Sequence, residues 1–318
     1  MKQFLLFLLL NMMCLSMFSQ EDITKKELKS HIQFLTSEKN AGRYPGGKEN
    51  RWVVKYIKNE FERLGIKPFK KKYKQVFKAE LRVDKDVDKK PIVTTCNVIS
   101  FIEGNDPVLK NEYIVLGAHY DHLGLGGPSS KSNKRGLVYH GADDNASGTS
   151  ALLEIAEKLA SQRQQLKRSV LFIAFGAEEQ GLLGSKYFVE HPVVPLSQIK
   201  LMINLDMVGR LNVEKQVYMG GAGTFPDGVD FMKDLGTSLG LNPVVHAGSV
   251  GGSDHVSFYK KGISVLGIHT GGHPQYHTPE DTLDLINIEG EKQVCEYVFQ
   301  TILQKGSSTD EMHFINQD

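Results

Sequence analysis

Four short apolar runs, each continuous rather than alternating with polar residues, constrain the fold of this 318-residue chain most strongly. Such runs are typical of β-strands that are buried on both faces. Helical patterns separate most of them; in residues 150–159, for example, Leu152, Ile155 and Leu159 recur at helical spacing. This alternation predicts an α/β fold with a mostly parallel central sheet flanked by helices on both faces. The runs are residues 113–116, 170–175, 201–205 and 263–268.

Two helical patterns precede the first apolar run. Thr24 and Glu27 form a capping box, which predicts the start of a helix at this point. A second amphipathic pattern extends from Trp52 to Phe61 and is expected to stop near Gly65. The basic segment 67–74 that follows is interpreted as a solvated edge strand, because lysines commonly protect sheet edges from pairing.

The chain begins with a pattern typical of a signal peptide. Lys2 precedes apolar stretches at residues 4–10 and 12–15, which are shorter than the roughly 20 apolar residues that span a bilayer. A retained anchor and a lipoprotein modified at Cys14 are the alternatives. We predict a signal peptide at 1–19, a single domain at 20–305 and a flexible polar tail at 306–318. A secreted or periplasmic protein without a membrane span after cleavage would result.

The overall charge and the cysteines exclude few classes of function or partner. The 38 basic and 37 acidic residues give a net charge of +1, so no charge argument favours nucleic acid as a partner. Cys96 and Cys295 remain after the predicted cleavage. They could form a disulfide or remain as two buried free thiols, and the sequence leaves both alternatives open. The oligomeric state is open as well.

Each of the four apolar runs leads into residue types that bind metals. Ligands of open α/β sheets bind beyond the carboxyl ends of the strands, so these side chains are expected to meet in one place. A further acidic stretch, residues 141–148 (GADDNASG), lies directly before a predicted helix. The residues are His119 after the first run, Glu178 and Glu179 after the second, Asp206 after the third, His277 after the fourth, and Asp143 and Asp144 in the acidic stretch.

The charges of these residues indicate two divalent metal ions. Three carboxylates, taken as Asp144, Glu179 and Asp206, together with a bridging hydroxide, offset two Zn²⁺ ions, whereas one ion would leave a costly net negative cluster. Nitrogen and oxygen ligands without thiolate are typical of catalytic rather than structural zinc. Composition does not decide which of Asp143 and Asp144 bridges the metals.

Two further roles follow from position in the chain. Neighbouring side chains on an extended or turning segment point in different directions, so Glu179 can bind metal while Glu178 stays free as a general base. Asp121 lies two residues after His119 and could orient its imidazole. Tyr276, directly before His277, is a further candidate for the site.

These motifs together resemble the M28 family of co-catalytic zinc aminopeptidases. The matching text is HYD at 119–121, GADDNASG at 141–148, EE at 178–179, NLDM at 204–207, SDH at 253–255 and YHTPED at 276–281, in the family's order from about residue 25 to residue 303. The resemblance implies a zinc-peptidase α/β/α fold and peptides with free N-termini as substrates.

The resemblance also assigns roles to individual residues. It implies two zinc ions per chain, with Asp144 as the bridging ligand and Glu178 as the general base. It implies Asp121 as the carboxylate behind His119, and Tyr276 as a group that helps to stabilise the tetrahedral intermediate. The implied metal ligands are His119, Asp144, Glu179, Asp206 and His277.

Three alternative functions remain at this stage. Carboxypeptidases of the same family share the two-metal core but need basic residues around the substrate carboxylate. Glutaminyl cyclases have a similar fold, bind one zinc and depart from the Asp-Asn-Ala-Ser-Gly stretch that is intact here. A non-catalytic receptor-like homologue would be expected to lose ligands or the general base, and this chain has retained both.

Several polar residues near these motifs have structural interpretations. Arg210 is expected to form an ion pair rather than to bind substrate, and Asp254 is expected to shape the pocket. Asp143 is interpreted as a cap or as a partner of a ligand. The remaining histidines of this region are expected to line the cleft or to form structural hydrogen bonds. They are His122, His140, His255, His269 and His273.

Overall fold

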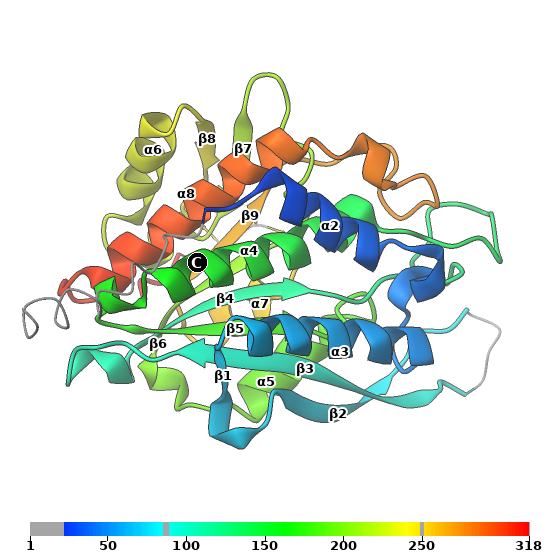
Figure 1. Cartoon of the computed structure of the whole chain (residues 1–318), viewed down its shortest axis with the longest axis horizontal. Coiled ribbons are helices and arrows are strands. Elements are labelled where there is room, and N and C mark those ends of the chain that lie inside the picture. The colour runs from blue at the N-terminus through cyan, green and yellow to red at the C-terminus, as the bar shows by residue number, and fades with distance from the viewer. Residues whose placement is uncertain (1–21, 85–88, 249–250, 318) are drawn as a thin grey trace, which may run out of the picture.

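A nine-stranded mixed sheet organises the molecule, with helices on both of its faces (Figure 1). The computed structural model describes residues 22–84, 89–248 and 251–317. The strand order is β1-β3-β5-β4-β6-β9-β7-β8, and β2 also pairs with β3. The strands are β1 Lys67–Pro68, β2 Lys74–Glu80, β3 Ile92–Ile102, β4 Tyr113–His119, β5 Ser169–Phe175, β6 Ile199–Leu205, β7 Gln216–Gly220, β8 Asn242–Val245 and β9 Val265–His269.

The four apolar runs form the centre of this sheet, as predicted. They correspond to β4, β5, β6 and β9, which pair in parallel with one another. Successive residues face opposite sides, so that Leu116 lies in one hydrophobic core and Val115 in the other. The α/β class with both faces covered is therefore confirmed. Parallel pairing is concentrated at the centre, because β3 and β7 run antiparallel to β5 and β9.

The helices divide between the two faces. Helices α2 (Lys25–Leu35), α3 (Lys48–Arg63), α4 (Gly148–Ser161) and α8 (Ile288–Ser307) contribute to the larger core, on the face turned toward the viewer in Figure 1. Helices α5 (Leu183–Glu190) and α7 (His255–Tyr259) cover the opposite face. Helix α6 (Gly228–Ser238) packs beside β8. Thr24 caps α2 as predicted, because its hydroxyl oxygen accepts the N–H of Glu27 at 3.1 Å.

The connections place a crevice at the centre of the sheet. Strand β4 leads through α4 to β5 on one side, whereas the next strand in the chain, β6, lies on the other side of β4. The chain thus changes direction at β4. In open α/β sheets, the space outside the carboxyl ends of the strands at such a point is where ligands bind.

Two local predictions are wrong. Residues 67–74 do not form one edge strand: β1 ends at Pro68, a short 3₁₀ turn with Lys70 at a φ of 51° follows, and β2 starts only at Lys74. The end of the chain is not a free polar tail, because buried Arg168 donates to the carbonyl oxygens of Ser308 and Asp310, and Met312 is buried. An internal arginine needs acceptors, and this segment supplies them.

Some expectations fall partly or wholly outside the described residues. The predicted signal peptide lies there, as does the last residue of the predicted polar tail, Asp318. Within the described ranges, no helix combines the length and the apolar character that crossing a bilayer requires. Cys96 and Cys295 are both buried and free, so of the two alternatives the structure has the unpaired thiols.

Candidate metal centre

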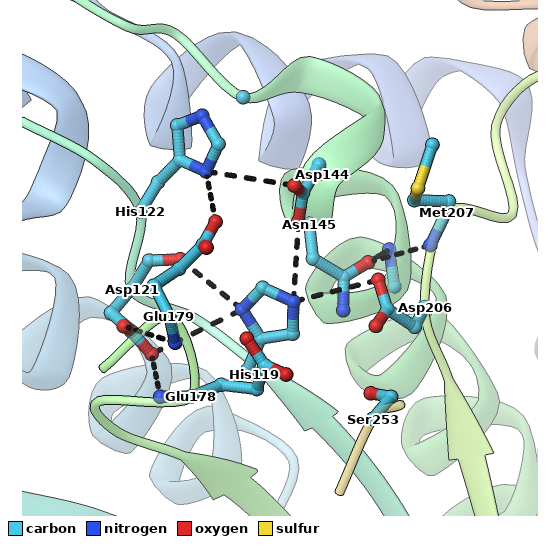
Figure 2. Close-up of polar contacts among 12 residues, drawn as sticks. His119, Asp121, His122, Asp144, Asn145, Glu178, Glu179, Asp206, Met207 and Ser253 are labelled. Atoms are coloured by element: carbon cyan, nitrogen blue, oxygen red, sulfur yellow. Dashed lines mark hydrogen bonds and ion pairs between the residues drawn. The ribbon is translucent and has the colours of Figure 1, made fainter. Parts of the chain in front are cut away.

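The predicted ligand residues all lie in the crevice at the carboxyl ends of the central strands, and most of them are visible in Figure 2. His119 is the last residue of β4, and Asp206 directly follows β6. Glu179 follows β5, and His277 lies in the loop after β9. Asp144 belongs to the turn Ala142–Ser147 that leads into α4. All except Asp206 are buried.

The two carboxylate oxygens of Asp144 face two different groups of donor atoms. Its Oδ1 lies 3.3 Å from His119 Nε2, and the same Nε2 lies 3.5 Å from Asp206 Oδ1. Its Oδ2 lies 3.0 Å from His277 Nε2, which is 3.1 Å from Glu179 Oε2. Each oxygen of Asp144 is therefore grouped with one imidazole and one further carboxylate.

The hydrogen bond of His277 Nδ1 determines which ring nitrogen is free to bind a metal. His277 Nδ1 lies 2.7 Å from the main-chain oxygen of Ser129, which can only accept, so Nδ1 carries the proton. In the neutral ring, the lone pair of Nε2 then points at the oxygens of Asp144 and Glu179. Burial lowers the pKa of His277, but the Asp144 and Glu179 carboxylates raise it, in sum to about 10. In the metal-free chain Nε2 therefore holds a proton between these two carboxylates, and a metal ion would take the place of that proton.

The spacing of the donor atoms fits zinc. Zinc bonds to nitrogen and oxygen of about 2.0–2.1 Å place tetrahedral donor atoms about 3.3 Å apart. The distances around Asp144 are 3.0 to 3.5 Å. His119, Asp144 and Asp206 also have donor atoms close enough together to share one ion. The residues present therefore fit a divalent ion such as zinc, and both oxygens of Asp144 have an imidazole nitrogen nearby.

Asp121 lies behind His119, as predicted, and it also contacts the Glu178–Glu179 turn. The nearest contact of His119 Nδ1 is the main-chain oxygen of Asp121 at 3.2 Å, whereas the Asp121 carboxylate lies 4.0 Å away. That carboxylate accepts the N–H groups of Glu178 at 2.9 Å and of Glu179 at 3.4 Å (Figure 2). Asp121 thus joins the end of β4 to the Glu178–Glu179 turn.

The carboxylate of Asp281 accepts hydrogen bonds from the backbone of the Asp144 turn. It is fully buried, and its Oδ2 accepts the N–H groups of Asp143 and Asp144, each at 3.0 Å. Its Oδ1 lies 3.2 Å from the guanidinium of Arg210, which confirms the ion pair expected for that arginine. The sequence motif contained Asp281, but no local pattern indicated that its partners would lie almost 140 residues away.

Asn145 ties the Asp144 turn to the Asp206 strand end. Its side-chain amide donates to the main-chain oxygen of Leu205 at 2.8 Å, and its side-chain oxygen accepts the N–H of Met207 at 3.2 Å. Both partners are immediate neighbours of Asp206. The relative positions of Asp144 and Asp206 are thus defined by one buried amide, which supports the grouping of their oxygens around His119.

Glu178 is turned into the pocket rather than toward the second metal group. The pocket has a volume of about 220 Å³, and Glu178 lines it together with His119, Asp144 and Asp206. Burial and the neighbouring carboxylates of Glu179, Asp254 and Asp206 raise the pKa of Glu178 well above its usual range, against the opposing effect of His119. A carboxylate with a raised pKa beside the reacting position is suited to accept a proton.

Tyr276 also lines this pocket. Its ring stacks on His277 with centroids 3.8 Å apart, and the ammonium group of Lys131 lies 4.0 Å from the ring centroid. Burial and nearby carboxylates raise the pKa of the Tyr276 phenol well above its usual range. The hydroxyl therefore stays protonated at neutral pH and can serve as a hydrogen-bond donor.

Two histidines without a predicted ligand role contact the carboxylates of the site. His122 Nδ1 lies 2.8 Å from Glu179 Oε1 and 4.0 Å from Asp144 Oδ2 (Figure 2). His273 Nε2 lies 3.2 Å from the carboxylate of the buried Asp143. Asp143 therefore pairs with His273 and does not belong to either group of donor atoms around Asp144. The contact of His273 agrees with its structural interpretation. His122 also has a donor atom close enough to those of Asp144 and Glu179 for the three to share one ion, which no sequence pattern indicated.

Comparisons of the sequence relate this chain to known proteins. Residues 97–302 match the sequence profile described as Peptidase family M28. Aminopeptidase YwaD of Bacillus subtilis is 34% identical over 203 residues, which are 61% of this chain and 41% of that protein. The chain spans less than half the length of the curated relatives it matches.

Solved structures share the fold. A Zn-dependent exopeptidase from Parabacteroides distasonis has a TM-score of 0.72 at 21% identity, over 90% of this chain and 99% of the other. Porphyromonas gingivalis glutaminyl cyclase has a TM-score of 0.70 at 21% identity, over 90% of this chain and all of the other. At this identity, both likenesses concern the fold alone.

Proposed function

This chain belongs to peptidase family M28, and we propose that it is an exported aminopeptidase that binds two zinc ions and removes residues from free peptide N-termini. Curated relatives named aminopeptidases support the activity. The observation that carries the proposal is the position of Asp144, whose two oxygens each complete a group of one imidazole and two carboxylates.

The proposed roles assign each group of donor atoms to one ion. His119, Asp206 and one oxygen of Asp144 would hold the first ion. His277, Glu179 and the other oxygen of Asp144 would hold the second. When bound, such a pair supplies an activated water and polarises the scissile carbonyl.

The chain's own residues account for the proton transfers. Glu178 takes a proton from the attacking water and returns it to the leaving amine, which its place in the pocket and its raised pKa support. Tyr276 faces the same pocket with a protonated hydroxyl and donates a hydrogen bond to the oxygen that becomes negatively charged. Asp121 positions Glu178 through the main-chain N–H of that residue.

The charge of the pocket favours a free amine over a free carboxylate as the substrate terminus. None of the described residues that line the pocket is lysine or arginine. Glu178, the carboxylate of the pocket lining that the proposed roles leave without a metal ion, faces it. A substrate ammonium group would be attracted to this carboxylate, whereas a terminal carboxylate would be repelled. This observation supports an aminopeptidase over a carboxypeptidase.

Export is the part of the proposal that rests on the sequence of residues 1–19 alone. It predicts a mature chain that starts near Gln20 and is found outside the cytoplasm. N-terminal sequencing of the protein from culture medium and from periplasmic extracts tests this directly. A chain that retains Met1 and stays in the cytoplasm would contradict it.

A peptide panel read by mass spectrometry tests the activity. Free-amine, N-acetylated and N-terminal-Gln peptides are incubated with the mature chain, with and without a zinc chelator. We expect stepwise loss of N-terminal residues from peptides with a free amine, and no cleavage after chelation. Loss from the C-terminus would identify a carboxypeptidase, and loss of ammonia from N-terminal Gln without cleavage would identify a cyclase. Unchanged peptides would favour the non-catalytic homologue.

A further inference from the structure

Arg43 is buried completely at the back of the metal centre and has an unusual set of partners. Its guanidinium donates to four main-chain oxygens: those of Tyr120 at 2.9 Å, Leu35 at 3.1 Å, His140 at 2.6 Å and Gly141 at 3.0 Å. Buried charges are normally paired with an opposite charge in direct contact. Arg43 is instead surrounded by neutral carbonyl groups.

Three of the four partners of Arg43 belong to the two loops that carry His119 and Asp144, and the fourth, Leu35, ends helix α2. Tyr120 directly follows His119, and His140 and Gly141 lead into the turn that contains Asp144. Asp281 holds the N–H groups of this same turn from its other end. Arg43 and Asp281 therefore fix the Asp144 turn from its carbonyl side and its N–H side.

The charge of Arg43 is balanced by the site as a whole. Burial lowers the pKa of Arg43, and the carboxylates of Asp144, Asp121, Asp281 and Glu179 counteract this, in sum to about 10, so that the group remains charged at neutral pH. The carboxylates thus stabilise the arginine through space without a direct ion pair. Among them, Asp144 and Glu179 keep an oxygen directed at His277 Nε2, where the second ion would bind.

The backbone around Arg43 adopts a strained conformation. Ala41, Gly42 and Arg43 have φ angles of 39°, 69° and 53°, and such left-handed conformations cost non-glycine residues on the order of 1 kcal/mol each. A Cβ atom on Gly42 would lie 2.4 Å from the main-chain oxygen of Gly124. The turn persists because Gly124 donates its N–H to Gly42 and Asn50 donates to the main-chain oxygen of Arg43. Strain of this kind is concentrated at functional sites.

We propose that Arg43 is a positioning residue of the metal centre, which clamps the His119 and Asp144 loops from behind and so pre-organises them for zinc. Arg43 precedes residues 97–302, the part that matches the family profile, so the N-terminal segment completes the site of this chain. The inference rests on the proposed function only in requiring that the site binds zinc, not in which peptide bond is cut.

Arg168 provides a matched control within the same chain. It is also buried, and it donates to the main-chain oxygens of Lys305, Ser308 and Asp310, but it lies directly before β5, at the amino ends of the parallel strands. The replacements R43K and R168K each keep a positive charge while removing the forked set of donors. Both are expected to lower thermal stability, so stability alone does not separate the two roles.

Zinc affinity distinguishes the proposed role of Arg43 from the role of Arg168. It is measured by competition with a chromophoric chelator, well below the melting temperature, on variants whose circular dichroism shows a folded chain. Loss of a residue that orients metal ligands lowers affinity about 10–100-fold. We expect R43K and R43M to show such a loss, and R168K to bind zinc as the wild type does. Wild-type affinity in folded R43K, or tighter binding in R43M through removal of a repelling charge, would overturn the proposal.

Hydrogen exchange on the unmutated protein gives a second test that does not depend on the variants folding. The N–H groups of Gly124 and Tyr139 donate to the main-chain oxygens of Gly42 and Gly124. If Arg43 organises these loops in advance, both amides stay protected after zinc is removed by chelation. Exchange as fast as in an unstructured peptide would overturn the proposal. A wild-type chain that binds zinc but cleaves no peptide would contradict the proposed activity and leave this result valid.

Discussion

The two ends of the parallel strands bury charge in opposite ways. At the amino ends, Arg168 lies 2.7 Å from the carboxylate of Glu112 and satisfies its remaining donors with carbonyl groups. At the carboxyl ends, the Asp144 and Glu179 carboxylates both approach one nitrogen of His277, and Arg43 has carbonyl contacts only. At the amino ends, the positive charge of Arg168 is therefore paired with a carboxylate. At the carboxyl ends, two negatively charged carboxylates lie close to each other.

Backbone strain also distinguishes the carboxyl ends of the parallel strands from their amino ends. Ala177, Met207 and His277, which are ligand residues or lie within two positions of one, have φ angles of 60°, 63° and 60°. Such conformations persist where the surrounding structure imposes them, and they are concentrated at functional sites. The amino ends are thus organised for stability, whereas the carboxyl ends gather the side chains that we propose bind cations. Each prediction below contrasts one end of the strands with the other.

The largest effect is expected for Glu178→Gln. Removing the proton acceptor while keeping its shape should lower kcat by about 10³-fold, within the range typical of general-base catalysis, with zinc content unchanged. Glu112→Gln at the amino ends serves as the control and should affect thermal stability rather than kcat. Steady-state kinetics with a cleaved peptide, together with elemental analysis, measure both. Wild-type turnover in Glu178→Gln would refute the assigned role.

A smaller effect is expected for Asp281→Asn. The neutral amide weakens the hold on the N–H groups of Asp143 and Asp144 and leaves Arg210 without its ion pair. Zinc affinity should fall about 10–100-fold, as for other residues that orient ligands. Competition with a chelator measures this, and Glu112→Gln should leave the affinity unchanged. Equal affinities in both variants would remove the distinction between the two ends.

The metal-free protein should become less stable as the pH rises. The folded pKa of His277 is about 10, set by burial and the opposing carboxylates, against an ordinary value of about 6.5. Because the folded chain binds this proton more tightly, the stabilisation is complete below pH 6.5 and is lost as the pH rises through 10. Urea unfolding of chelator-treated protein should show this decline, and His277→Gln should reduce it. A wild-type stability that increases over this range would contradict the electrostatic account.

The smallest effect is expected for His122→Gln. The imidazole contacts Glu179 Oε1, and a glutamine amide can donate in its place. We expect zinc affinity to fall by about fivefold, the equivalent of a hydrogen bond worth about 1 kcal/mol. His122→Ala should lose more. If both variants bind zinc as the wild type does, His122 fills space only.

The sequence predicts the centre of this molecule better than its periphery. Except for Asp144, each donor residue follows a buried apolar run, and parallel strands bring those ends together, so the meeting of His119, Asp206 and His277 follows from local pattern and topology. The carboxylate of Asp121 and the guanidinium of Arg43 find their main partners in segments distant in the chain, which no periodicity encodes. The packing of the C-terminal segment against Arg168 is missed for the same reason.

Native mass spectrometry of the zinc-loaded protein tests the central claim most directly, namely that the two oxygens of Asp144 unite two metal positions. The wild type should carry two zinc ions per chain, and Asp144→Asn should lose both under the same conditions, while Glu112→Gln should retain them. A wild-type chain that carries a single zinc ion, or an Asp144→Asn chain that still carries two, would contradict the account.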